Sequence, residues 1–283
     1  MLAESAYGKS RIRIVQLQRR SSLHTLCDLT VAVRFEGDYD DSYAAGDNAA
    51  VLPTDTMKNT VYALAARDGL QGPEEFGLRL ARYFLDRNPP LRCVRIDLTE
   101  HAWRHITIGG REAEHAFERQ GGGTRTATVE MTRERTTVGA GVSDLMILKS
   151  AHSAFAGFVR DEYTTLPETH DRLLATSMTA TWRYENTETS FGPTWYAVRR
   201  TLLETFAEHD SRSVQHTLHA MGQAVLERHR DVATIHLVMP NKHHLAFDVS
   251  RFGLENRNEI FVATDEPHGL IEATLVRHGG RTP

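Results

Sequence analysis

Leu29-Thr30-Val31-Ala32-Val33-Arg34-Phe35-Glu36 alternates bulky apolar side chains with small or polar ones. A period of two is typical of a strand that buries one face in an antiparallel sheet. The preceding residues 11–20 alternate in the same way, except for a break between Ile14 and Leu17 that a β-bulge would explain. The two segments predict a long hairpin that turns near residues 21–24.

Two helices are predicted after this hairpin. Thr54 and Asp55 are residue types that cap a helix, and apolar side chains follow them at helical spacing. Pro73 suits the first turn of a second helix, and Asn88-Pro89-Pro90 ends it.

The rest of the chain completes the order of elements. Strands are predicted over residues 91–98 and 124–132, joined by a turn at Gly121-Gly122-Gly123, and over residues 142–148 and 178–184. A helix opened by Pro193, a helix over 214–225, and strands over 235–239, 245–249 and 270–277 follow. Each half reads β-β-α-α-β-β, which predicts an α+β fold with antiparallel sheet, built from a duplicated unit over residues 1–138 and 139–283.

Composition excludes several classes of protein. The 283 residues leave room for one large or two ordinary domains. With 33 basic and 37 acidic side chains and no long basic run, nucleic-acid binding is disfavoured. No apolar run approaches the roughly 18 residues of a membrane span.

The ends of the chain and its cysteines predict a cytoplasmic protein. Residues 1–5 lack the basic cluster and apolar core of a secretory signal. Residues 279–283 lack a peroxisomal Ser-Lys-Leu. Cys27 and Cys93 are too few for a disulfide framework, so we expect both to be reduced.

Fifteen histidines raise the question of a metal site. The pairs His101/His105 and His216/His219 have helix-like spacing for a shared ligand. The first pair lies at a strand end, however, and the second flanks the apolar stripe of its helix without a nearby carboxylate. The sequence has no Cys-x-x-Cys or His-Glu-x-x-His, so we expect no metal.

Four segments carry more chemically active side chains than their surroundings. They are Tyr7-Gly8-Lys9, residues 48–60, residues 155–172, and Pro240-Asn241-Lys242-His243-His244. Each has a structural explanation on its own: a solvated lysine, a helix cap, a surface salt bridge and a turn. Composition alone leaves both interpretations open.

Taken together, these segments resemble one family, urate oxidase (uricase). The matching stretches include Tyr7-Gly8-Lys9, Thr54-Asp55-Thr56-Met57-Lys58-Asn59-Thr60, Arg160-Asp161-Glu162-Tyr163-Thr164-Thr165-Leu166, Pro240-Asn241-Lys242-His243 and Thr264-Asp265-Glu266-Pro267-His268-Gly269-Leu270-Ile271-Glu272-Ala273-Thr274. The resemblance runs in order from Tyr7 to Arg277, with His244 where the family often has Tyr and Met57 where Ile is usual.

The resemblance implies the tunnelling fold: two tandem β-β-α-α-β-β units per chain, sheets that close across subunits into a β-barrel, and a homotetramer. It also implies oxidation of urate by O₂ and water to 5-hydroxyisourate and H₂O₂, without a metal or organic cofactor. The family's proton relay maps to Lys9, Thr54 and His243. Its substrate-binding groups map to Thr54, Asp55, Phe155, Arg172, Val214, Gln215 and Asn241. Lys9, Thr54 and Asp55 would come from one chain and the others from its neighbour.

These residue types suit the chemistry of urate, a flat anion with alternating N–H and C=O groups on its edges. Arg172 offers a rigid fork for an anionic carbonyl edge, and Gln215 can donate and accept at the opposite edge. The backbone N–H of Val214 lies in the first turn of a predicted helix, which favours an anion. Phe155 would lie against the ring face.

Oxidation needs a second proton removed from urate, so that the substrate becomes a good one-electron donor to O₂. A threonine hydroxyl is too weak an acid to act alone, but a neutral Lys9 could serve as the base through Thr54. His243 could pass protons near neutral pH, and Asn241 would hold O₂ or water above the ring.

Two other functions are compatible with parts of this pattern. One is a different purine- or pterin-processing tunnelling-fold enzyme, although such relatives generally need zinc ligands that this chain lacks. The other is a catalytically silent urate-binding protein, for which Lys9, Thr54 and His243 would be superfluous. Turnover of urate in the presence of a strong chelator separates the three.

Overall fold

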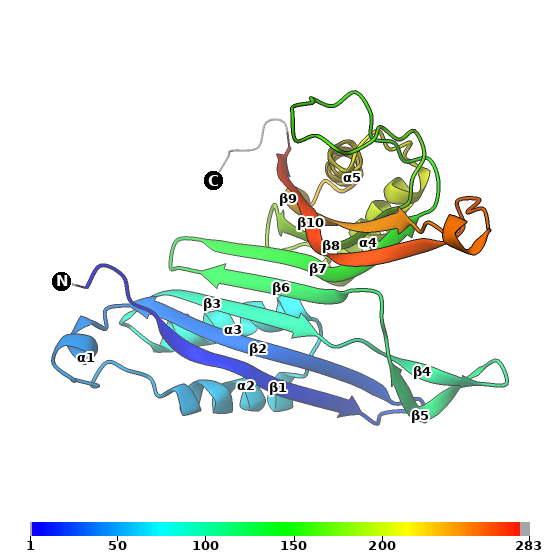
Figure 1. Ribbon diagram of the computed structural model, residues 1–283. Helices are drawn as coiled ribbons and strands as arrows, with labels where there is room; N and C mark the ends of the chain where they lie inside the picture. The colour runs from blue at the N-terminus through cyan, green and yellow to red at the C-terminus, as the bar shows by residue number, and fades with distance from the viewer. Residues whose placement is uncertain (1, 278–283) are drawn as a thin grey trace. The chain divides into compact units, whose positions relative to one another are not determined.

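A computed structural model of the chain describes residues 2–277 (Figure 1). The terminal residues 279–283 discussed above lie outside the described residues. The fold is α+β with antiparallel sheet, as predicted. The chain divides into two compact units, one made of Met1–Gly141 with Arg183–Trp195 and the other of Val142–Trp182 with Tyr196–Pro283. None of the helices between residues 2 and 277 is long and apolar enough to cross a membrane.

The first unit is built on an antiparallel sheet with the strand order β1-β2-β3-β6. Its elements, in chain order, are β1 (Tyr7–Gln18), β2 (Thr25–Gly37), α1 (Asp40–Ala44), α2 (Thr54–Asp68), α3 (Pro73–Arg87), β3 (Leu91–Glu100), β4 (Trp103–Ile108), β5 (Arg111–Arg119) and β6 (Thr124–Met131). Helix α2 packs on β1, and α3 packs on β3 and β6. The predicted alternation of β2 is confirmed, because Leu29, Val31, Val33 and Phe35 are all buried. Phe35 meets Phe84 of α3 edge to face, with ring centroids 5.1 Å apart.

The second unit takes its elements from the rest of the chain. They are β7 (Thr136–Lys149), β8 (Leu174–Tyr184) and α4 (Phe191–Glu208), each of which begins or ends in the first unit, and α5 (Val214–Arg228), β9 (Val232–Ala246), a short 3₁₀ turn (Ser250–Phe252) and β10 (Phe261–Val276). Helix α5 packs on β9 and β10. Its buried stripe, which includes Leu218, Met221 and Val225, meets the inward face of β9, where Ile235, Leu237 and Met239 are fully buried.

The structure corrects three predictions about the first unit. The turn at Gly121–Gly123 does not connect β3 directly to β6. These two strands pair in the sheet, but the chain forms the β4–β5 hairpin between them. The bulge lies between Lys9 and Ile12, whereas Ile14 and Leu17 pair regularly with β2. Pro53 is the N-cap of α2, so Thr54 and Asp55 are its first two helical residues and do not cap it.

One prediction about the second unit is also wrong. Residues 235–239 and 245–249 are not two strands, because β9 runs without a break from Val232 to Ala246. Proline normally interrupts a strand. Pro240 is accommodated here beside an irregularity of β10, where the register shifts between Thr264 and Gly269.

The order β-β-α-α-β-β occurs in both units, with α1 and the β4–β5 hairpin as additions in the first. The sheets of residues 2–277 form no closed barrel, so the barrel across subunits stays a prediction.

Cys27 and Cys93 are both free and half-buried. Cys27 pairs with Gln16 at one end of β2, and Cys93 pairs with Glu36 at the other. Cys27 and Glu36 are nine positions apart along β2, which is about 30 Å. A disulfide needs Cα atoms within roughly 7 Å. Burial raises the pKa of the Cys27 thiol to about 12, which makes it a poor nucleophile at neutral pH.

Candidate active site

Lys9 and Thr54, two of the three residues expected to handle protons, lie where α2 begins over β1. The Tyr7 hydroxyl accepts a hydrogen bond from the backbone N–H of Leu52 at 3.0 Å, which ties the segment before Thr54 to the start of β1. Further along, the Tyr62 hydroxyl of α2 donates to the Arg13 carbonyl at 2.9 Å. Eight helical residues from Thr54 to Tyr62 span about 12 Å, close to the distance along β1 from Lys9 to Arg13. Lys9 and Thr54 therefore lie level with each other.

The charge of Lys9 acts on the neighbouring carboxylate of Asp55. The pKa of Asp55 is lowered, first by the hydrogen bond and charge of Lys58, whose Nζ is 2.5 Å from Oδ1, and further by Asn59 and by the charge of Lys9. Asp55 is thus an ionised group of the first turn of α2, where the helix dipole favours an anion.

Phe155 and Arg172 lie together in the second unit. The Arg172 guanidinium lies over the Phe155 ring, with its central carbon 5.4 Å from the centroid. Burial lowers the pKa of Arg172 from its usual value, although a guanidinium stays charged at neutral pH. Its Nε atom is buried and has no hydrogen-bond partner among the described residues. A buried cationic donor of this kind is suited to an anionic acceptor.

Short backbone bridges hold this pair beside the start of α5. Phe155 exchanges two backbone hydrogen bonds with Thr169, at 2.8 and 3.0 Å, and the Arg172 N–H donates to the Ser153 carbonyl at 2.8 Å. Ser153 in turn forms a parallel bridge with Ser211. Ser211 is three residues before Val214, so the segment that carries Phe155 and Arg172 is fixed to the N-terminus of α5.

Sequence reasoning missed the residues that make this frame. Lys149, only 9% exposed, donates from Nζ to the His209 carbonyl at 2.5 Å, and burial lowers its pKa. Its charge lies at the C-terminal end of α4, where the helix dipole favours a cation. A lysine at the end of a strand and two serines 58 residues apart have no periodicity that would have pointed to them.

The N-terminus of α5 presents Val214 and Gln215. Ser213 is the N-cap, and its hydroxyl accepts from the His216 N–H at 3.1 Å. The N–H groups of the first turn have no acceptor inside the helix, so the N–H of Val214 is available to a ligand anion. Val214 is buried and Gln215 is exposed.

Asn241 and His243 lie on β9, on the face that packs against α5. They continue the odd-numbered stripe of Leu237 and Met239, and Asn241 is 9% exposed. Helix α5 is about 22 Å long, and β9, which runs back along it, spans the same length in about seven residues. From Val232, seven residues reach Met239, so Asn241 and His243 lie just beyond the level of Val214.

The structure therefore brings the expected residues into two groups with a common plan. In each, side chains on the helix-facing stripe of a strand lie near the N-terminus of a helix. The first group, in the first unit, contains Lys9, Thr54 and Asp55. The second, in the second unit, contains Phe155, Arg172, Val214, Gln215, Asn241 and His243.

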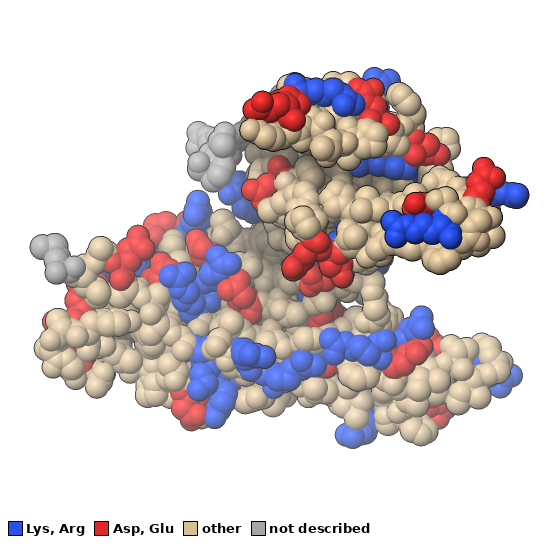
Figure 2. Space-filling view, viewed as in Figure 1, with Lys and Arg blue, Asp and Glu red and all other residues tan. Residues whose placement is uncertain are grey.

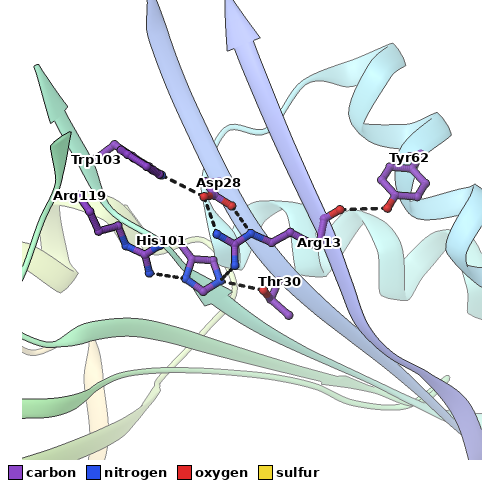
Figure 3. A network of polar contacts seen from close by, with 7 residues as sticks. All are labelled: Arg13, Asp28, Thr30, Tyr62, His101, Trp103 and Arg119. Atoms are coloured by element: carbon purple, nitrogen blue, oxygen red, sulfur yellow. Dashed lines mark hydrogen bonds and ion pairs between the residues drawn. The ribbon is translucent and has the colours of Figure 1, made fainter. Parts of the chain in front are cut away.

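The histidines considered for metal have other surroundings. His216 lies against His209, with ring centroids 4.3 Å apart. His101 belongs to a polar network in the first unit (Figure 3), between the guanidinium groups of Arg13 and Arg119, each 2.7 Å away. Within residues 2–277, no cluster of three or more His, Cys, Asp or Glu side chains is arranged to hold a metal ion.

Asp28 is the buried centre of the network in Figure 3. Its carboxylate, 3% exposed, accepts from Arg13 Nε at 2.6 Å and Nη2 at 2.7 Å, and from the Trp103 indole at 3.0 Å. Burial alone would raise the pKa of Asp28, but these hydrogen bonds and the charge of Arg13 outweigh it, so the pKa is lowered.

We expect Asp28→Asn to destabilise the fold by about 1–3 kcal/mol at pH 7, the usual effect of losing hydrogen bonds to a charged group. The lowered pKa means that the stabilisation is complete above the unfolded value near 4 and is lost as pH falls through the folded value. Denaturant unfolding at a fixed protein concentration measures this. The difference between the variant and the original chain should shrink from pH 7 to pH 3, and a constant difference would contradict the assigned role of the charge.

Other charges on the first unit are mixed in sign. Figure 2 shows Lys and Arg side chains across this unit with Asp and Glu between them. Arg34 pairs with Glu36 at 3.1 Å, and Arg95 with Asp97 at 3.0 Å.

Comparisons with known proteins show which family the chain resembles. The profile of the uricase family matches residues 5–130 and 138–272. The uricase of Arthrobacter globiformis is 43% identical over 281 residues, which cover 99% of this chain and 91% of that protein. The uricase of Dictyostelium discoideum is 36% identical and covers 99% of both chains. The crystal structure of the Arthrobacter globiformis uricase matches with a TM-score of 0.95 at 42% identity, covering 100% of this chain and 97% of that one.

Proposed function

The chain belongs to the uricase family and is a urate oxidase, and we propose that it oxidises urate with O₂ and water to 5-hydroxyisourate and H₂O₂ through the two groups of residues described above. Atoms and electrons balance, because the two electrons and two protons lost from neutral uric acid convert O₂ to H₂O₂, and water adds across the oxidised purine to supply the hydroxyl group. No metal or organic cofactor enters this scheme.

The buried, unpaired Nε of Arg172 is the observation that carries this proposal. A guanidinium edge presents Nε and one Nη as parallel donors, which match a carbonyl edge of the urate anion. Phe155, already against Arg172, supplies the face for the purine ring. The N–H of Val214 and the amide of Gln215 would bind the opposite edge, beside the positive end of the α5 dipole.

Proton transfer is assigned to Lys9, Thr54 and His243. Lys9 of β1 lies level with Thr54, the first residue of α2, so the threonine hydroxyl can relay a proton to the lysine amine. Removing this proton from bound urate raises its electron density and makes one-electron transfer to O₂ feasible. Asn241, almost fully buried beside His243, would hold O₂ or water over the ring.

Neither group forms a complete site alone. The first has the base but no anion-binding fork, and the second has the fork but no base. We propose that the chain consists of two tandem tunnelling-fold units, that four chains form a homotetramer with sheets closed into a barrel, and that the first group of one subunit meets the second group of its neighbour. The recurrence of β-β-α-α-β-β in the two units supports this arrangement.

The direct test follows the loss of urate's ultraviolet absorbance with purified protein in the presence of a strong chelator. Sustained turnover with stoichiometric H₂O₂ supports a cofactor-independent oxidase. Activity that the chelator abolishes and added metal restores would refute cofactor independence. Binding of urate without turnover would make the protein a silent member of the family.

Arg172→Lys should raise the KM for urate while the fold is kept. One point charge replaces two parallel hydrogen bonds, a loss of about 1.5–3 kcal/mol, or roughly 10- to 100-fold in affinity. Steady-state kinetics and calorimetric binding of an unreactive purine analogue measure the effect. Arg160→Lys is the matched control, because Arg160 is an exposed arginine of the same segment. Equal affinities in the Arg172 variant and the original chain would remove Arg172 from the site.

A further inference from the structure

The β-bulge in β1 lies immediately after Lys9, and we propose that it is the device that directs Lys9 to the helix-facing side of the sheet. The inference concerns the positioning of Lys9 and rests on the proposed function only for the consequence on catalysis. Ser10 and Arg11 form the bulge, and what positions Lys9 is the pairing that they allow between β1 and β2, not the chemistry of either side chain.

The strand register shows how the bulge acts. Lys9 pairs with Val33 and Ile12 pairs with Val31, so Ser10 and Arg11 together face the single residue Ala32. Val31, Val33 and Ile12 are buried on the side that packs against the helices. Lys9 therefore shares the face of Ile12 although the two are three residues apart. In a regular strand, residues three apart point to opposite faces.

The backbone is shaped to hold this irregularity. Arg11 has a φ of +59°, a left-handed conformation that is uncommon for any residue other than glycine. Next to the bulge, Gly8 approaches β2 so closely that a Cβ atom would lie 1.9 Å from the Val33 carbonyl oxygen. Bulges often re-aim side chains beside active sites, and an unusual φ in the middle of a strand is a reason to look for such a role.

Without the extra residue opposite Ala32, the same sequence would place Lys9 elsewhere. Ile12 would stay opposite Val31, Arg11 would face Ala32 and Ser10 would face Val33. Lys9 would then pair with Arg34, an exposed residue on the face away from α2. It would be separated from Thr54 by the thickness of the sheet.

The first strand of the second unit has a similar backbone conformation and burial pattern. Asp144 of β7 has a φ of +55°, and Val142 and Leu145, three residues apart, are both buried. The local sequences correspond position by position, Gly8-Lys9-Ser10-Arg11-Ile12 in β1 and Gly141-Val142-Ser143-Asp144-Leu145 in β7. This correspondence between individual residues supports the proposed duplication.

Strands β1 and β7 differ in the side chain that this conformation turns inward. In both strands, the residue two positions before the left-handed one and the residue directly after it are at least half-buried. In β7 the first of these two residues is Val142, which is 1% exposed and serves the core. In β1 it is Lys9, which is half-buried and acts electrostatically on Asp55. We infer that the same backbone irregularity buries an apolar side chain in the second unit and directs the proposed base, Lys9, toward Thr54 in the first.

Two deletions test the inference because they move Lys9 in opposite ways. Deleting Ser10 removes the bulge but leaves one residue opposite Ala32, so Lys9 still faces Val33 and kcat should stay of the same order as in the full chain. Deleting Ser10 and Arg11 together places Lys9 opposite Ala32, on the other face. For this chain kcat should fall about 10²- to 10⁴-fold, as for loss of a general base. Binding of an unreactive purine analogue should change little in both, because most of the proposed binding groups lie in the second unit and neither deletion removes Thr54 or Asp55.

Engineered cysteines report the register without any use of activity. In a Cys27→Ser, Cys93→Ser background, paired substitutions Lys9→Cys and Val33→Cys should form a cross-strand disulfide in the full chain and in the Ser10 deletion. In the double deletion, Lys9→Cys should instead link with Ala32→Cys. A 9–33 link that persists in the double deletion would overturn the inference. The expected links combined with undiminished kcat in the double deletion would leave the register inference standing and refute the proposed role of Lys9.

Arg11→Val supplies a test by point substitution, since a β-branched residue strongly disfavours the left-handed conformation. We expect it to lower kcat, and we expect deletion of Ser10 in the same chain to restore it, because valine then sits in a regular strand. Because the deletion also relieves the backbone strain at residue 11, kcat is compared under conditions in which denaturant unfolding shows every variant to be fully folded. Full kcat in Arg11→Val, or no rescue by the deletion, would contradict the role of the bulge.

Discussion

Lys9→Met is expected to lower the turnover number of urate oxidation by about 10²- to 10⁴-fold, the usual contribution of a general acid–base group. Its effect on binding should be small, because the fork, the stacking face and the helix N-terminus that we propose to hold the purine belong to the second unit. The two quantities are measured separately, as kcat from steady-state kinetics and as the dissociation constant of an unreactive purine analogue.

Lys58→Met is the matched control for this prediction. Lys58 donates directly to Asp55 and contributes more than Lys9 to the lowered pKa of that carboxyl. If the essential effect of Lys9 were only its charge near Asp55, the Lys58 variant should lose at least as much activity. We expect it instead to retain most of its turnover. An equal loss in the two variants would contradict a base role for Lys9.

Thr54→Ala in the Lys9→Met chain tests whether the two residues form one relay. Groups that act in a single step lose far less together than the product of their separate effects. The combined variant should therefore be scarcely slower than Lys9→Met alone. Independent, multiplicative losses would mean that the hydroxyl and the amine serve different steps.

The sequence predicted the elements whose signals are local. Strand β2 and helix α3 were found because a buried stripe repeats every two or every three to four residues. The β4–β5 hairpin was missed because none of its residues is buried, so no apolar alternation marks it. The bulge was misplaced for a related reason. Gly8, Lys9, Ser10 and Arg11 carry no apolar side chain that would reveal a change of face, whereas the misleading break near Leu17 lies at the half-exposed end of β1.

Prediction of the site had a similar limit. Residue chemistry and the resemblance predict a binding role for Arg172 and Phe155, but they do not predict the contacts that place these residues beside α5. That placement depends on backbone bridges between Ser153 and Ser211 and between Phe155 and Thr169, and on the buried Lys149. Backbone hydrogen bonds of this kind depend little on side-chain identity, so the residues that make them leave almost no trace in a single sequence.

The proposed division of the site between subunits predicts complementation between two inactive chains. Each group of residues comes wholly from one unit, and a two-fold axis that joins unlike units of two chains creates two equal sites per pair. A chain with Lys9→Met is damaged only in the first group, and a chain with Arg172→Ala only in the second. In a mixed pair, one site then carries both lesions and the other carries neither.

Unfolding the two variants together in equal amounts and refolding them should therefore restore activity. With random assortment, a site draws an intact first group and an intact second group in about one case in four, so recovery should approach a quarter of the original activity. Each variant refolded alone gives the baseline. Differently tagged chains, purified sequentially through both tags, show that mixed oligomers have formed and should concentrate the activity. Mixed oligomers no more active than the separately refolded variants would place the complete site within one chain.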